Sequence, residues 1–303
     1  MKQARYLFLV LLLLGRFAGS AQNVNLVAAY DCANRNSMDS ARLFLFKAMT
    51  DSTTRKDAQA WYIKGFIYKE LYKKYEKDNK LSPLRDTSII SLFLSIKLDS
   101  VTKTNIEDCK KTAKYLAVTY YNDAASGMDS LHYTLSIHDY ARYKEIMKKV
   151  APTTNFNSSD VMFYLKLGDV YSYLYFHASP GKENMYLDSA KRAYNMVLAI
   201  DPNQVSANFN LAILYYNKAT NIINRMDYDA DIMKLNAAQD SSVNLMKMSL
   251  PYMLKTYDLD NCKKDALKGL EGIYYLLHDT QKFEEFQQKL QLIESHQGNS
   301  PCK

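Results

Sequence analysis

The chain is poor in the residues that interrupt helices. Only 9 glycines and 6 prolines occur among its 303 residues. A fold of many short strands needs such residues at its turns, so their scarcity argues against a many-stranded β protein. Blocks of like charge are also missing: the formal net charge is +7, but the basic residues are scattered among acidic ones. We therefore find no electrostatic signature of nucleic-acid binding and expect no nucleic-acid partner.

Catalytic and metal-binding motifs are missing as well. The sequence contains no G-x-S-x-G, H-E-x-x-H, G-x-x-x-x-G-K or G-x-G-x-x-G pattern, and no two of its 5 histidines lie three or four residues apart. The run Asp227–Asp231 alternates carboxylates as a calcium loop does, but Ile232 and Ala238 stand where the loop needs a glycine and a bidentate glutamate. A polar linker explains this run better, and we predict a protein without enzymatic activity, cofactor or metal site.

The N-terminal segment has the order of charged, apolar and small residues that is typical of a secretory signal. Lys2 and Arg5 precede the apolar run Tyr6–Leu14, and Gly19-Ser20-Ala21 follows it. That run is shorter than the roughly 20 residues that a membrane span needs, although a membrane anchor is the alternative. We predict a signal peptide over residues 1–21. The mature chain would then begin at Gln22, lack a transmembrane segment, and be periplasmic or secreted.

Helical periodicity dominates the sequence after the signal segment, and the helices are predicted to come in pairs. Pro83 suits the first turn of a helix, Ser158-Ser159-Asp160 suits a helix cap, and Pro251 is expected to kink a long helix. The predicted helices cover residues 25–34, 38–49, a segment around 61–68, 83–99, a segment around 113–120, 136–150, 161–176, 186–200, 204–224, 237–257, 263–277 and 281–295.

One spacing of aromatic and small residues recurs in the first helix of several pairs. It appears as Trp61, Gly65 and Tyr68, as Tyr164, Leu167, Gly168 and Tyr171, and as Asn208, Leu211, Ala212 and Tyr215. The second of these is followed by Ala190-Tyr194-Val197 and then by Asp201-Pro202. The pattern resembles the tetratricopeptide repeat. The resemblance implies an all-α, right-handed solenoid of about five to six helical hairpins over residues 22–297, with a loose tail at residues 298–303.

In the tetratricopeptide family the first helix of each hairpin lines a concave groove, and the recurring residues form the internal packing. Tyr121, Tyr216 and Tyr275 each directly follow a packing tyrosine and would therefore point about 100° away from it, toward the groove. Aromatic rings beside lysines and asparagines suit an extended peptide, whereas the alternative is that these rings fill the core. The residues expected in the groove are Tyr62, Phe66, Lys69, Lys111, Lys114, Tyr121, Asn122, Tyr173, Phe209, Tyr216, Asn217, Lys268 and Tyr275.

The repeats therefore predict a binding scaffold, and the Tyr-, Asn- and Lys-rich composition resembles exported repeat proteins of Bacteroidetes. The expected partner is a protein or peptide of the cell envelope. The alternative is a glycan-binding helical-repeat protein of a nutrient-uptake system, although such proteins resemble longer lipoproteins and this chain has a single tryptophan. An enzyme would need a convergent set of polar residues that the sequence does not reveal.

The four cysteines form no C-x-x-C motif, which argues against a zinc or redox site. Cys262 begins the first helix of the last pair and Cys302 follows the second, so antiparallel packing would bring them together. We predict a disulfide between these two and make no prediction for Cys32 and Cys109.

Four Asp-Ser-aliphatic triplets begin at Asp39, Asp99, Asp129 and Asp188. They resemble O-glycosylation acceptors of some bacterial exported proteins. Helix capping is the favoured interpretation, because Asp and Ser are preferred at helix starts.

Overall fold

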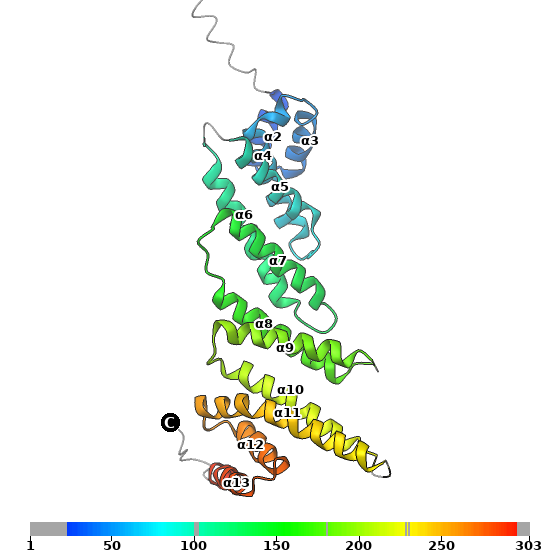
Figure 1. Cartoon of the computed structure of the whole chain (residues 1–303). Helices are drawn as coiled ribbons and strands as arrows, with labels where there is room; N and C mark the ends of the chain where they lie inside the picture. Colours follow the sequence, from blue (N-terminus) through cyan, green and yellow to red (C-terminus); the bar gives the residue numbers. More distant parts are fainter. Residues whose placement is uncertain (1–22, 100–102, 180, 228, 230, 296–303) are drawn as a thin grey trace, which may run out of the picture. The chain divides into compact units, whose positions relative to one another are not determined.

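All regular structure in the described part of the chain is helical. The structure, a computed structural model, describes residues 23–99, 103–179, 181–227, 229 and 231–295, which form twelve α-helices and no strand (Figure 1). The helices are α2 (Val24–Asn34), α3 (Met38–Ala48), α4 (Ala58–Leu71), α5 (Pro83–Leu98), α6 (Ile106–Ser126), α7 (Tyr133–Val150), α8 (Asn157–Phe176), α9 (Glu183–Ile200), α10 (Val205–Asn224), α11 (Ile232–Leu259), α12 (Lys264–Leu276) and α13 (Thr280–Ser295).

Consecutive helices pack as pairs, which confirms the predicted all-α fold of helical hairpins. The pairs are α2 with α3, α4 with α5, α8 with α9, α10 with α11, and α12 with α13. Helices α6 and α7 meet through the ring of Tyr121, which lies beside the rings of Tyr140 and Tyr143. The chain divides into two compact units. The first contains the described residues up to Ala124 together with Ile137–Thr154, and the second contains Ala125–Ser136 and the described residues from Asn155 onwards.

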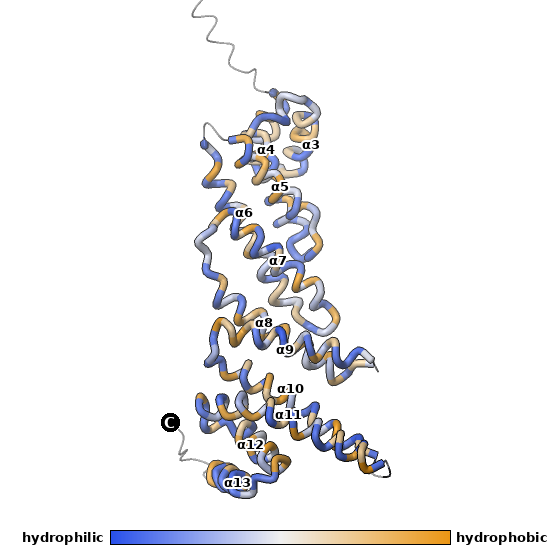
Figure 2. Tube along the Cα trace, viewed as in Figure 1, coloured by the Kyte–Doolittle hydropathy of each residue, from blue (hydrophilic) through white to orange (hydrophobic). Residues whose placement is uncertain are grey.

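The recurring small residues permit close approach of the two helices in a pair. A Cβ atom on Gly65 would lie 2.6 Å from the side chain of Leu92, and one on Gly168 would overlap the ring of Tyr194. The predicted frame is thus an internal packing frame, in which a small residue on the first helix makes room for a large one on the second. Each helix carries both hydrophobic and hydrophilic residues along its length (Figure 2), as expected for elements with one buried face.

Serine hydroxyls of the second helix reinforce this close approach. Ser88 and Ser95 of α5 donate to the backbone carbonyls of Gly65 and Ala58 in α4, at 2.7 and 2.8 Å. Ser249 of α11 likewise donates to the carbonyl of Ala212 in α10, at 2.8 Å. These hydroxyls are buried, so each of them needs such a partner.

Several predicted helix ends are confirmed and others are wrong. Helix α5 begins at Pro83, and the Ser82 hydroxyl accepts from the backbone N–H of Arg85. The predicted cap at Ser158–Asp160 is wrong: α8 begins at Asn157, because the backbone N–H of Asp160 already bonds to the carbonyl of Phe156. Helix α11 begins five residues before the predicted 237, because Asp231 caps it through the N–H of Met233.

The Asp-Ser-aliphatic triplets do not share one structural role. Asp129 accepts hydrogen bonds from the N–H groups of Leu131 and His132, as a capping residue does. Asp188 lies inside α9, where no cap is needed. Ser100 and Val101 lie outside the described residues, as do the predicted signal segment and Cys302, so the Cys262–Cys302 pairing stays a prediction.

The core of the second unit contains two buried clusters, and the half-buried Leu245 and Tyr252 pack against both. Tyr194, Leu211 and Leu214 belong to one buried cluster, and Met246, Met253, Leu267 and Leu270 belong to the next. The ring of Phe286 stacks on that of Tyr274 at a centroid distance of 5.6 Å. None of the described helices combines the length and apolarity that crossing a membrane requires.

Candidate binding clefts

Two consecutive first helices of the second unit, α10 and α12, form a cleft of about 330 Å³. Four of the residues predicted for the groove line it, namely Phe209, Tyr216, Asn217 and Lys268. These four side chains, from two helices, thus border one cleft. We call this site the α10–α12 cleft; its lining residues are Phe209, Ile213, Tyr216, Asn217, Asp265, Lys268 and Gly269.

The lining of the cleft combines aromatic rings with charged side chains. The ammonium of Lys263 lies 4.6 Å from the centroid of the Phe209 ring, in cation–π geometry. Lys268 is exposed and its ammonium is 3.8 Å from a carboxylate oxygen of Glu294, a distance at which it stays available to a ligand. With Asp265 also on the lining, the cleft offers one charge of each sign next to apolar surface.

Tyr216 packs against Gly272 of α12, where the lack of a side chain leaves room for the tyrosine hydroxyl. A Cβ atom on Gly272 of α12 would overlap the Tyr216 hydroxyl. Burial raises the pKa of this tyrosine, and the nearby Glu271 raises it further. Tyr216 is thus partly a packing residue of α10 against α12 and partly a wall of the cleft.

The other two tyrosines at the same repeat position have different surroundings. Tyr121 is half-buried, with its ring 5.2 Å from that of Tyr143. Tyr275 is 67% exposed and its ring lies 5.8 Å from that of Phe283, beside a small hollow of about 230 Å³. Equivalent positions in the sequence thus do not form one continuous row of exposed rings.

The remaining predicted groove residues do not line the α10–α12 cleft. In α4, the Lys69 ammonium lies 4.5 Å from the Phe66 ring centroid and 2.6 Å from a carboxylate oxygen of Glu70, and burial raises the pKa of the neighbouring Tyr62. In α8, Tyr173 is 52% exposed and stacks on His177 at 4.1 Å. In α6, the predicted groove residues Lys111, Lys114 and Asn122 are exposed.

A second and larger cleft was not predicted from the sequence. It measures about 630 Å³ and lies where the end of α8, the start of α9 and the last half of α10 meet. We call it the α8–α10 cleft; its lining residues are Tyr175, Phe176, Ala178, Glu183, Asn184, Asn217, Lys218, Thr220, Asn221, Ile222, Asn224 and Arg225. The available signal was the spacing of Asn217, Asn221 and Asn224, which share one face of a helix.

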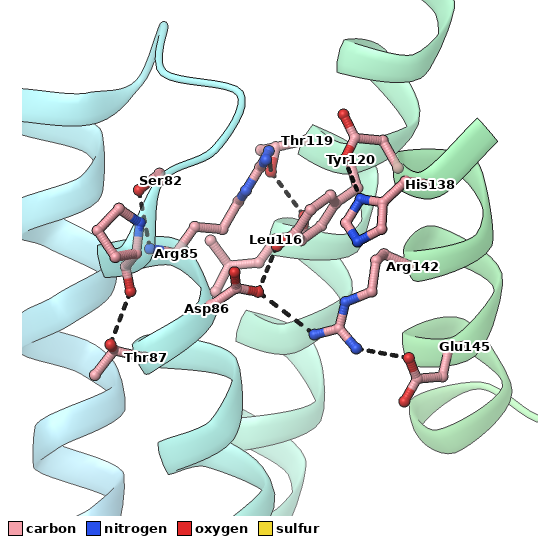
Figure 3. A network of polar contacts seen from close by, with 12 residues as sticks. Ser82, Arg85, Asp86, Thr87, Leu116, Thr119, Tyr120, His138, Arg142 and Glu145 are labelled. Atoms are coloured by element: carbon pink, nitrogen blue, oxygen red, sulfur yellow. Dashed lines mark hydrogen bonds and ion pairs between the residues drawn. The ribbon is translucent and has the colours of Figure 1, made fainter. Parts of the chain in front are cut away.

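The first unit contains a buried polar cluster that the sequence analysis also missed (Figure 3). Arg85 is completely buried, its Nη1 lies 2.5 Å from Oδ2 of Asp123, and its Nη2 donates to the carbonyl of Lys80 at 2.6 Å. The Tyr120 ring centroid is 3.6 Å from the guanidinium carbon of Arg85, and the Tyr120 hydroxyl donates to Asp86 at 2.5 Å. Arg85 lies one helical turn before Ser88 on the buried face of α5, which was the signal for its burial.

Asp139 lies inside this part of the first unit and is only 1% exposed. Its Oδ1 is 3.1 Å from Nδ1 of His138, but its Oδ2 has no hydrogen-bond partner among the described residues. Burial raises the pKa of Asp139 above the usual 3.8, although His138 and Arg85 act in the opposite direction. Ionisation of this carboxyl is therefore less favourable in the native protein than in the unfolded chain.

We expect Asp139→Asn to stabilise the protein at neutral pH. The native state binds the Asp139 proton more tightly than the unfolded state does, because the native pKa is raised. The stability that this group contributes is therefore complete below pH 3.8 and is lost as the pH rises through the native pKa. The amide stays neutral, so the variant should be more stable than the parent chain at pH 7, and the difference should shrink toward about pH 4. Urea unfolding at both pH values measures it, and a pH-independent difference would contradict the prediction.

The described residues show no convergent metal-ligand set. No three His, Cys, Asp or Glu side chains come together within residues 23–99, 103–179, 181–227, 229 and 231–295. In the Asp227–Asp231 linker, the Asp227 carboxylate accepts from the N–H of Asp229, and Asp231 caps α11. Both carboxylates thus bond to local backbone, as in a polar linker.

No family model matches the chain, and no curated protein matches its sequence. Among solved structures it is similar to a monomeric IFIT1 mutant with Gppp-AAAA, at 12% identity and a TM-score of 0.35 over 84% of this chain and 46% of that one. The chain is also similar to the human IFIT1 dimer with m7Gppp-AAAA, at 12% identity and a TM-score of 0.35. That match covers 88% of this chain and 67% of the IFIT1 chain. The chain thus spans about half the length of the first of these proteins. At such scores the likeness is one of helical architecture and gives no basis for a shared ligand.

Proposed function

We propose that the chain is a non-enzymatic binding scaffold of the bacterial envelope that holds an extended segment of a protein partner in the α10–α12 cleft. The observation that carries the proposal is the convergence of Phe209, Tyr216, Asn217 and Lys268, predicted from sequence as groove residues, on one cleft. Aromatic and aliphatic surface can bury apolar side chains of a peptide, while Asn217, Asp265 and Lys268 can bind its polar groups.

Export is the second element of the proposal. It is supported by the N-terminal order of charged, apolar and small residues, which is typical of a cleavable signal over residues 1–21. The mature chain would then meet its partner in the periplasm or outside the cell.

The proposal is tested by inverting the charges of the α10–α12 cleft. The full chain is first used to capture partners from an envelope fraction, and peptides of each captured protein are then titrated by fluorescence anisotropy. We expect the double variant Asp265→Lys with Lys268→Glu to weaken binding of the peptide at least about tenfold, or about 1.4 kcal/mol, because each position then repels the group that it bound. The net charge of the chain does not change.

A matched swap on α11 controls for general effects of moving charge. Asp240 and Lys247 are both exposed and line neither cleft, so Asp240→Lys with Lys247→Glu should leave the affinity unchanged. Equal affinity of the cleft variant and the parent chain would exclude the α10–α12 cleft as the binding site.

A further inference from the structure

The α8–α10 cleft has an unusual concentration of side-chain amides. Asn184 stands in the first turn of α9, and Asn217, Asn221 and Asn224 follow one another along α10. None of these four amides forms a side-chain hydrogen bond with another residue that the structure describes. Each therefore offers two N–H donors and a carbonyl acceptor to a ligand.

An aromatic ring borders the same cleft. Phe176, the last residue of α8, is 50% exposed, and its ring lies 5.0 Å from that of the buried Tyr175. An exposed phenylalanine that is fixed against a second ring is a rigid apolar surface, on which a flat apolar face of a ligand can pack.

The charged residues of the cleft leave an excess of one positive charge. Lys218 and Arg225 form no ion pair with any described residue, and one oxygen of Glu183 accepts from the N–H of Gly181 at 2.7 Å. The cleft thus favours an anionic ligand.

We infer that the α8–α10 cleft binds a short saccharide that carries a carboxylate. A sugar ring presents vicinal hydroxyls that each donate and accept, which matches the free amides, and its C–H face can pack on Phe176. The volume of about 630 Å³ is within the range of small-molecule sites. This site is separate from the peptide cleft of the proposed function, although Asn217 borders both.

The arrangement of the amides favours a saccharide over a peptide. An extended peptide presents its backbone groups in a line with a repeat of about 3.3 Å per residue, and a single row of partners along one helix would suffice. Here three amides form a row along α10, but the fourth, Asn184, comes from α9, and the end of α8 completes the lining. Polar groups on two helices beside an exposed ring suit a compact ligand with polar groups on more than one side.

The test uses the full chain and defined sugars. Digalacturonic and trigalacturonic acid are titrated by calorimetry beside neutral galactose oligomers of the same length. We expect the acidic oligomers to bind and the neutral ones to bind at least about tenfold more weakly. Absence of binding to the acidic oligomers, or equal binding to both sets, would overturn the inference.

Variants then locate the site. Asn221→Ala with Asn224→Ala should reduce the affinity at least about tenfold, because each amide would lose hydrogen bonds to the sugar. Both residues are exposed, so the fold should be unaffected. Asn244→Ala on α11 removes an exposed amide outside the cleft and should bind normally. Phe176→Ala should weaken binding, whereas Phe46→Ala, at a residue that is 73% exposed in α3, should not.

Failure of this inference can be distinguished from failure of the peptide site. Asp265→Lys with Lys268→Glu alters only the α10–α12 cleft, so it should leave the affinity for trigalacturonic acid unchanged. Asn221→Ala with Asn224→Ala alters only the α8–α10 cleft, and if it abolished peptide binding and left sugar binding intact, the cleft would be a peptide site instead.

Discussion

Asp123→Ala is expected to lower the free energy of unfolding by about 3–5 kcal/mol. The variant removes the carboxylate that lies 2.5 Å from the guanidinium of Arg85, a side chain with no exposed surface. Arg85 would keep its bonds to the Lys80 carbonyl and the Thr119 hydroxyl, but neither of these is charged. A buried cation that loses the carboxylate paired directly with it costs several kcal/mol, which explains the size of the expected effect.

A second variant separates the lost ion pair from lost packing. Replacing both partners, as Arg85→Met with Asp123→Leu, removes the buried charge together with its counter-ion and should recover most of the stability. Glu145→Ala is the surface control: Glu145 pairs with Arg142 at 2.6 Å, but both are partly exposed, so its loss should cost less than about 1 kcal/mol. Urea unfolding of all four proteins gives the comparison. If Asp123→Ala cost no more than Glu145→Ala, Arg85 would not depend on this carboxylate.

The sequence predicts the packing frame of this fold well, because the frame is set by local spacing. Gly65, Leu167, Gly168, Leu211 and Ala212 were expected inside and are buried, whereas the frame aromatics Trp61, Tyr68, Tyr164 and Tyr171 are half-buried. Residues three and four apart share one helix face, and that face must be apolar and partly small wherever a second helix packs closely.

The environments of the three repeat tyrosines could not be predicted in this way. Tyr121, Tyr216 and Tyr275 have the same local pattern, but each meets a different neighbour. The Tyr216 hydroxyl packs against Gly272 of α12. The Tyr121 ring lies beside the rings of Tyr140 and Tyr143, and Tyr275 is exposed. What a side chain meets depends on a helix distant in sequence, which periodicity does not specify.

The same limit applies to the α8–α10 cleft and to Arg85. The cleft forms where the ends of two helices and the start of a third meet, so its shape depends on helix lengths that the sequence predicted only to within several residues. Arg85 stands on the buried face of α5, but its burial depends on Asp123 and Tyr120 of α6, which lie more than thirty residues later. The local sequence pattern indicates that Arg85 lies on the buried face of α5, but it does not identify Asp123 and Tyr120 as its partners.

Gly168→Val should destabilise the second unit by about 3 kcal/mol. A Cβ atom on Gly168 would overlap the ring of Tyr194, which is only 1% exposed. Displacing this ring would also break the bond from its hydroxyl to Asp169, 2.9 Å long, and the 3.0 Å contact with the Ser172 hydroxyl. The better helix propensity of valine over glycine is worth a few tenths of a kcal/mol and cannot offset this overlap.

The size of the residue on the second helix determines whether a side chain is tolerated at the small position of the first helix. A double-mutant cycle between Gly168 and Tyr194 measures this dependence. Tyr194→Ala removes the ring and should itself cost several kcal/mol through the cavity it leaves. In that background Gly168→Val should cost much less than in the parent chain, because the valine methyl groups would enter the vacated space. Equal costs in the two backgrounds would show that the glycine is required for a reason other than the approach of Tyr194.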